Sequence, residues 1–70
     1  MYIGDSMETT YDVRQLLKRF GIFVYIGERT ADLNLMELEI TELYNTKCIT
    51  VSEYKQAILI LRKAKRELRG

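Results

Sequence analysis

Apolar residues recur every three or four positions in three separate stretches of this chain. Such spacing places the apolar side chains on one face of an α-helix. A chain of 70 residues has room for one domain, and it contains no proline that would interrupt a helix. The pattern therefore predicts an all-α fold, a small three-helix bundle in which the three apolar faces meet in one core.

The first two helices are expected over residues 10–20 and 31–45. Thr9 and Asp12 have the spacing of a capping box, with Asp in place of the usual Glu, and Gly21 supplies a left-handed stop. Thr30 is the expected N-cap of the second helix. These two helices are expected to give the core Val13, Leu16, Leu17, Phe20, Leu33, Met36, Ile40, Leu43 and Tyr44.

The third helix has the clearest start. Thr50 and Glu53 have the spacing of a capping box, while Ile49 and Tyr54 have that of a hydrophobic staple. The helix is expected to continue almost to Gly70, with Tyr54, Ala57, Ile58, Leu61, Ala64 and Leu68 on its core face. Residues 1–8 are expected to form a flexible N-terminal tail, and residues 9–70 the single three-helix domain.

A short apolar connector, bracketed by Gly21 and Gly27, joins the first two helices. Its β-branched and aromatic residues favour an extended backbone. Because a helical domain offers a lone strand no partner, we expect a tightly packed connector or a short turn of helix. Phe23 and Tyr25 are interpreted as closing the open end of the core, since an exposed run of this kind would aggregate. Two alternatives stay open: stacking platforms beside Arg29, and a ribbon formed with residues 2–5.

Composition excludes several classes of function. With no His and one Cys, the chain lacks the ligands of zinc, haem and iron–sulfur sites and the residues of Ser–His and Cys–His nucleophile systems. We therefore expect no enzyme, no metal and no cofactor. The longest apolar run is far shorter than the ~20 residues of a membrane span, and residues 1–6 lack the features of a signal peptide. A cytoplasmic protein is expected, with Cys48 as a buried, inert thiol.

Charge is distributed unevenly along the chain. Residues 28–46 carry one positive and five negative side chains, whereas residues 47–70 carry seven positive and two negative ones. On the third helix the cations Lys55, Arg62, Arg66 and Arg69 share one face, and Lys65 flanks them. On the first helix, Tyr11, Arg14 and Lys18 share a face. The candidate nucleic-acid-binding residues are therefore Tyr11, Arg14, Lys18, Lys55, Arg62, Lys65, Arg66 and Arg69.

These two basic faces have two interpretations. A row of cations can follow the phosphates of a nucleic acid with salt-dependent affinity, and an aromatic among cations is the minimal pattern for binding a single strand. The alternative is a pair of solvated faces, the third helix pairing with the acidic second one. Four apolar residues also fall outside the core stripes and predict a surface for a second copy or another protein, namely Leu35, Leu38, Leu59 and Ile60.

The order of several short motifs resembles that of a known family. They are residues 11–18 (YDVRQLLK), Phe20-Gly21, Tyr25-x-Gly27-Glu28-Arg29, Ala31-Asp32-Leu33, Met36-Glu37, Glu42-Leu43-Tyr44 and residues 56–62 (QAILILR). In these positions the chain resembles the YqgQ-like family, small cytosolic proteins of Gram-positive bacteria, over residues 9–68. The resemblance implies a three-helix bundle and suggests binding of single-stranded nucleic acid. It implies no functional residues.

We therefore expect a small non-enzymatic binding module. The leading hypothesis is that it binds single-stranded nucleic acid through the basic face of the third helix together with the first. The alternative is a protein-interaction or assembly module, a homo-oligomer or an adaptor, that uses the surplus apolar residues of the second and third helices. Neither hypothesis involves a membrane or a small-molecule substrate.

Overall fold

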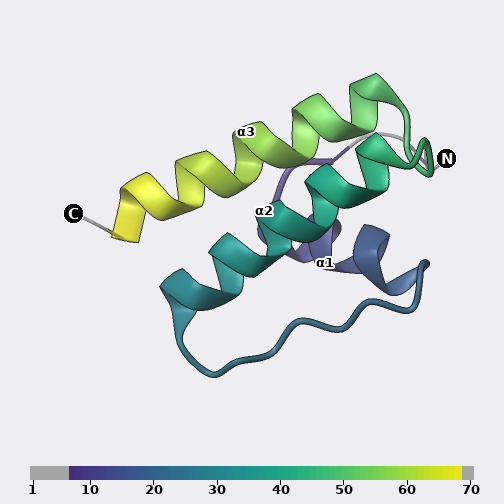
Figure 1. The fold of residues 1–70 in the computed structure, drawn as a ribbon. Coiled ribbons are helices and arrows are strands. Elements are labelled where there is room, and N and C mark those ends of the chain that lie inside the picture. The colour runs from purple at the N-terminus through teal and green to yellow at the C-terminus, as the bar shows by residue number, and fades with distance from the viewer. Residues whose placement is uncertain (1–6, 69–70) are drawn as a thin grey trace, which may run out of the picture.

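A computed structural model describes residues 7–68, and it confirms the predicted all-α architecture. The helices are α1 (Thr10–Lys18), α2 (Arg29–Asn45) and α3 (Val51–Leu68). Figure 1 shows α2 and α3 running side by side in opposite directions, with α1 behind them. An extended connector returns from the end of α1 to the start of α2 along one side of the molecule. No helix in the described part of the chain is long and apolar enough to cross a membrane.

Both predicted capping boxes are present. The Thr9 side chain accepts a hydrogen bond from the Asp12 N–H, and the Asp12 carboxylate accepts one from the Thr9 N–H. Thr50 and Glu53 make the same reciprocal pair before α3. Backbone N–H groups of Glu8 and Thr9 both donate to Asp12 and hold the pKa of its carboxyl below the usual value. Local side-chain chemistry therefore fixes both helix starts.

The start of α2 differs from the prediction. Glu28, not Thr30, is the N-cap, and its carboxylate accepts a hydrogen bond of 2.7 Å from the Ala31 N–H. The helix consequently begins two residues earlier than expected. Glu28 can do this because it has an extended backbone and its side chain reaches forward to the first turn of the helix. The prediction weighed Thr30 by residue preference alone, whereas Glu28 supplies a charged acceptor at the same helix end.

The core lies where the three apolar stripes meet. Its buried members are Val13, Leu16, Leu17, Val24, Leu33, Met36, Ile40, Leu43, Ile49, Ala57, Ile58 and Leu61. Three expected core residues are instead exposed: Phe20, Tyr44 and Leu68. Phe20 leaves the stripe because α1 ends at Lys18, before the predicted last turn. Gly21 then takes the expected left-handed conformation, with φ of 76°.

The connector is extended, and the interpretation of its aromatic residues was wrong. Val24 is buried in the core, while Phe23 and Tyr25 are 74% and 85% exposed. Alternate side chains of an extended backbone point to opposite sides, so burying Val24 turns its two neighbours outward. Phe23 and Tyr25 therefore do not close the end of the bundle. The ribbon with residues 2–5 lies outside the described residues.

The surplus apolar residues, the N-terminal tail and Cys48 differ in part from the expectations. Leu35 and Ile60 are partly buried and pack against the core, whereas Leu38 and Leu59 are 67% and 69% exposed. Met7, assigned to the tail, also packs against the core. Cys48 is exposed rather than buried, because it lies in the turn between α2 and α3, where its neighbour Ile49 takes the buried position.

Candidate nucleic-acid interface

The basic residues of α3 line a hollow beside the start of α2. Arg62, Lys65 and Arg66 come from the last turns of α3, and Thr30 and Asn34 from the first turns of α2. The space between them is about 460 Å³. We call these five residues the α2–α3 hollow. Because the two helices run in opposite directions, the beginning of one meets the end of the other there (Figure 1).

One carboxylate, Glu37, is bound to the cations of this hollow. Its Oε1 lies 2.6 Å from Lys65 Nζ, and its Oε2 lies 3.7 Å from Arg62 Nη2. Lys65 Nζ also donates to Asn34 Oδ1 at 3.1 Å. The Lys65 side chain is 27% exposed and that of Arg62 is 60% exposed. Glu37 therefore holds two cations in place but neutralises the charge of only one.

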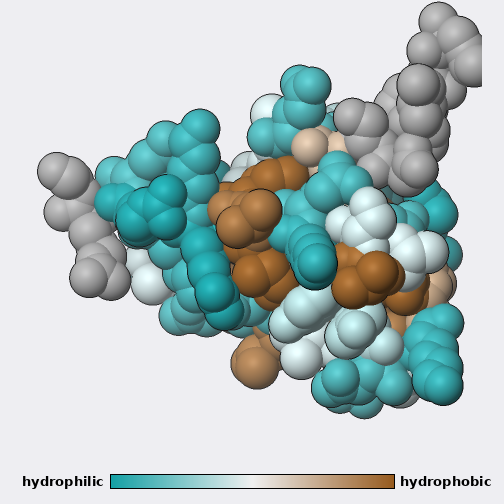
Figure 2. Space-filling model, turned by 90° about the horizontal axis from the view of Figure 1, so that it is seen from above, coloured by the Kyte–Doolittle hydropathy of each residue, from teal (hydrophilic) through white to brown (hydrophobic). Residues whose placement is uncertain are grey.

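The other predicted cations of α3 are free or undescribed. Within residues 7–68, neither Lys55 nor Arg66 makes an ion pair or a hydrogen bond through its side chain. Both are exposed, and Arg69 lies outside the described residues. Figure 2 shows the molecule from the α3 side, with hydrophobic residues near the middle and strongly hydrophilic ones toward the end of α3. The cationic side chains of α3 thus keep an excess of positive charge over Glu37.

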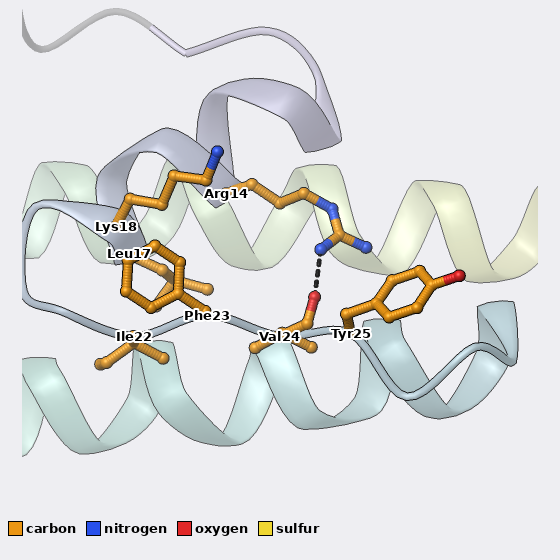
Figure 3. A pocket seen from close by; sticks show the side chains of 7 residues that line it. All are labelled: Arg14, Leu17, Lys18, Ile22, Phe23, Val24 and Tyr25. Atoms are coloured by element: carbon orange, nitrogen blue, oxygen red, sulfur yellow. Dashed lines mark hydrogen bonds between the residues drawn. The ribbon is translucent and has the colours of Figure 1, made fainter.

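The predicted residues of α1 lie around a different hollow. Arg14, Leu17 and Lys18 line a space of about 230 Å³ together with residues 22–25 of the connector (Figure 3). This space contains no residue of α3, and the α2–α3 hollow contains none of α1. Lys18 and Tyr11 are exposed. The structure therefore does not bring the two predicted basic faces together at one site.

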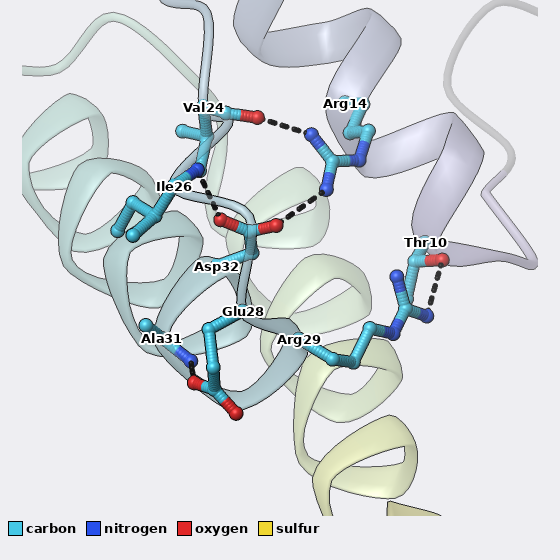
Figure 4. Close-up of polar contacts among 8 residues, drawn as sticks. All are labelled: Thr10, Arg14, Val24, Ile26, Glu28, Arg29, Ala31 and Asp32. Carbon is cyan, nitrogen blue, oxygen red and sulfur yellow. Dashed lines mark hydrogen bonds and ion pairs between the residues drawn. The ribbon is translucent and has the colours of Figure 1, made fainter.

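Arg14 makes structural contacts with the connector and α2 that the sequence pattern did not predict. Its guanidinium donates to the Val24 carbonyl oxygen, and its Nη2 lies 3.6 Å from Asp32 Oδ2 (Figure 4). The other oxygen of Asp32 accepts a hydrogen bond of 2.6 Å from the Ile26 N–H. Asp32 is buried, so these contacts compensate the cost of removing its charge from water. The pair fastens the connector to α1 and α2.

One aromatic contact joins α2 and α3 at the other end of the same helix pair. The rings of Tyr44 and Tyr54 stack with centroids 4.4 Å apart and planes 17° from parallel. Tyr44 is partly exposed, whereas Tyr54 packs against the core. Sequence reasoning placed both in the core stripes; the antiparallel alignment of α2 and α3 brings them together. The helix pair thus carries a partly exposed aromatic pair at the end away from the basic hollow.

Comparison with known proteins gives a consistent result over most of the chain. A family model described as YqgQ-like matches residues 7–67. A protein of Bacillus subtilis (strain 168), named "Uncharacterized protein YqgQ", is 44% identical over 57 residues, which cover 81% of this chain and 80% of the relative. Neither description states a ligand or a reaction.

Proposed function

The chain belongs to the YqgQ-like family, and from the geometry of its α2–α3 hollow we propose that it is a small, non-enzymatic module that binds single-stranded nucleic acid. Arg62, Lys65 and Arg66 would contact phosphates, and Lys55 would extend this contact along α3. Thr30 and Asn34 add neutral hydrogen-bonding groups at the rim. The observation that supports this most is the charge balance: three cations line the hollow against one carboxylate, Glu37.

Binding of a flexible single strand fits this shape better than binding of a duplex. The cations line a hollow between two helices, and a single strand can bend a phosphate into it. Contacts to phosphate carry no information about base sequence, so we expect broad sequence tolerance and strong salt dependence. The exposed part of Tyr44, at the other end of the same helix pair, would offer a base a stacking contact, the kind that sequence-tolerant single-strand binders use.

This proposal differs from the sequence-based hypothesis in one respect, since it no longer includes α1. The charge of Arg14 is committed to Asp32, and Lys18 lines the other hollow. Protein interaction through the surplus apolar residues of α2 and α3 is the second candidate function. Leu35 and Ile60 pack against the core, which leaves Leu38 and Leu59 as single exposed leucines, an ordinary feature of protein surfaces.

A charge-matched pair of double variants tests the proposal. Binding of a fluorescent single-stranded oligonucleotide of about eight nucleotides would be followed by anisotropy at about 50 and 200 mM salt. Arg62→Ala with Arg66→Ala removes two cations from the α2–α3 hollow. Lys18→Ala with Arg19→Ala removes two cations at the end of α1 and serves as the control. We expect the first pair to weaken binding and to make the log–log salt slope shallower by about 1.4, or ~0.7 for each lost phosphate contact.

Three results would contradict the proposal. The first is no detectable binding of the parent protein at the lower salt concentration. The second is an equal loss of affinity in the two double variants, which would show a response to net charge rather than to a site. The third is tighter binding of a duplex of the same length than of the single strand. Circular dichroism of each variant verifies that the helices are intact.

A cytoplasmic location belongs to the same proposal. The chain has one cysteine, and its thiol is exposed rather than protected in the core. An exposed free thiol is compatible with a reducing compartment, where cysteines remain unpaired. Labelling of Cys48 in intact cells with a permeant thiol reagent, and its failure with an impermeant one, would agree with this location.

A further inference from the structure

The connector runs in an extended course (Figure 1), and the hydrogen bonds that residues 23–26 make all lie on one of its two edges. On that edge the Val24 carbonyl accepts from Arg14 and the Ile26 N–H donates to Asp32 (Figure 4). In the described part of the chain, no hydrogen bond reaches the backbone N–H or C=O of Phe23 or Tyr25. Both residues are among the most exposed of the large hydrophobic side chains.

The geometry of an extended chain explains why Val24 and Ile26 are hydrogen-bonded while Phe23 and Tyr25 are not. The N–H and C=O of one residue point to the same edge, and the residues two positions apart share that edge. Val24 and Ile26 therefore face the Arg14–Asp32 pair, while Phe23 and Tyr25 turn four backbone groups toward the opposite edge. An unpaired edge beside apolar side chains is a template for another strand.

The edge of the connector that carries the unbonded backbone groups of Phe23 and Tyr25, here called the free edge, can pair with the same edge of a second copy. If two copies pair in antiparallel orientation about a two-fold axis at Val24, Phe23 of one lies opposite Tyr25 of the other. An antiparallel hydrogen-bonded pair exchanges two bonds, so the two Phe23–Tyr25 pairs use all four free groups of each copy. Val24 then faces its own equivalent in the non-hydrogen-bonded position. We propose that the protein forms a homodimer by pairing the connectors of two copies in this register.

A second copy explains more of the observations than a foreign peptide does. Residues directly opposite in a sheet also contact through their side chains, so each aromatic on the outer face gains an aromatic partner. The other edge is already occupied by Arg14 and Asp32. A two-fold pair is therefore closed, and it removes the hazard of an open edge without forming a fibre.

The size of the contact predicts a reversible dimer. A fully buried aromatic side chain contributes about 150–250 Å², so the four aromatics of two copies contribute at most roughly 600–1,000 Å². This is at the low end of specific interfaces, for which about 1,200–2,000 Å² is usual. We expect dissociation in the micromolar range or weaker. The proposal is independent of nucleic-acid binding, since the α2–α3 hollow contains no residue of the connector.

Sedimentation velocity from about 5 to 500 µM, the range in which micromolar dissociation is resolved, tests the oligomeric state of the full chain. Tyr25→Pro removes one N–H from the free edge, and Tyr25→Ala keeps that N–H but removes the ring. Because Tyr25 is exposed and makes no hydrogen bond, neither change should alter the helix content. We expect at least a tenfold weaker dimer for Tyr25→Pro, a smaller loss for Tyr25→Ala, and no change for the control Tyr11→Ala.

Nuclear magnetic resonance tests the register directly. In a mixture of labelled and unlabelled protein, the proposed dimer brings the Hα atoms of the two Val24 residues into contact, and the amides of Phe23 and Tyr25 become protected as concentration rises. A monomer at the highest concentration would overturn the proposal. So would a dimer of undiminished affinity in Tyr25→Pro, or a dimer without the Val24–Val24 contact. Protection of these amides only when an oligonucleotide is added would also overturn it.

Discussion

Replacing Glu37 with Gln separates a binding role of the α2–α3 hollow from a purely structural one. The Glu37 carboxylate contacts both Lys65, at 2.6 Å, and Arg62, at 3.7 Å. Glu37→Gln keeps the shape of the side chain but removes its charge, so both cations lose their ionic partner. If they hold a phosphate, the variant should bind single-stranded nucleic acid more tightly than the parent protein does.

The expected gain follows from the distances and the exposure of these groups. A phosphate bound to Arg62 or Lys65 would be repelled by the carboxylate that sits between them. Two unit charges about 4 Å apart in water interact by about 1 kcal/mol, which corresponds to a fivefold change in affinity. The water value applies because the Arg62 side chain is 60% exposed. At the same time the partly exposed ion pairs are lost, and the free energy of unfolding should fall by about 0.2–1 kcal/mol.

Two measurements on the same sample test whether Glu37→Gln binds more tightly and is at the same time less stable. Anisotropy titrations at about 50 and 200 mM salt should give a tighter Kd and a log–log slope steeper by ~0.7, one additional phosphate contact. Urea denaturation should show the small loss of stability. Glu42→Gln is the matched control, because Glu42 lies on the same helix and makes no side-chain ion pair among residues 7–68.

The reasoning fails if Glu37→Gln weakens binding in proportion to its loss of stability. That result would mean that Glu37 only supports the fold and that the cations beside it do not meet a ligand. An equal gain in Glu42→Gln would also refute it, since the effect would then come from net charge. A gain confined to Glu37→Gln is the result that the geometry requires.

Three further predictions concern the fold. Asp32→Ala should lower the free energy of unfolding in urea by about 1–3 kcal/mol, because it leaves two partly buried donors, the Ile26 N–H and the Arg14 guanidinium, without their acceptor; a loss within experimental error would mean that the connector is not held by this side chain. Leu61→Ala should cost about 2–5 kcal/mol in the same assay, and Leu59→Ala on the exposed side of α3 should cost almost nothing. The pKa of Asp12 is lowered in the folded state by backbone N–H donors, so its stabilising contribution is present above the unfolded-state pKa and is lost as pH falls through the folded one. The difference in thermal midpoint between Asp12→Asn and the parent protein should therefore be constant near neutral pH and shrink in acid; a constant difference down to the lowest pH at which the protein folds would contradict this.

The helices were predictable because their signals are local. Thr9 with Asp12 and Thr50 with Glu53 act within one turn, and the apolar stripes depend only on spacing. The connector was not predictable in the same way. Its expected packing rested on hydrophobicity, which treats Phe23, Val24 and Tyr25 alike. An extended backbone instead points neighbouring side chains to opposite sides, and here it is Val24 that faces the core.

The candidate site was predictable in part for the same reason. Helical spacing predicts Lys55, Arg62 and Arg66 on one face of α3, and Arg62 and Arg66 line the same hollow. The spacing contains no information about which residue of α2 lies beside that face, so the contact of Glu37 with Lys65 could not be derived from it. That contact depends on the antiparallel alignment of α2 and α3, which the whole core determines.

The two arginines of the original hypothesis show how burial decides between structure and binding. Arg14 and Arg62 each lie on a helix face with another cation, and each is within 4 Å of a carboxylate. The carboxylate beside Arg14 is buried and that side chain also binds a backbone carbonyl, so a ligand would have to replace contacts that hold the connector. The carboxylate beside Arg62 is shared with Lys65, and most of the Arg62 side chain faces water. A phosphate can therefore displace Glu37 from Arg62 at little cost, whereas displacing Asp32 from Arg14 would release part of the fold.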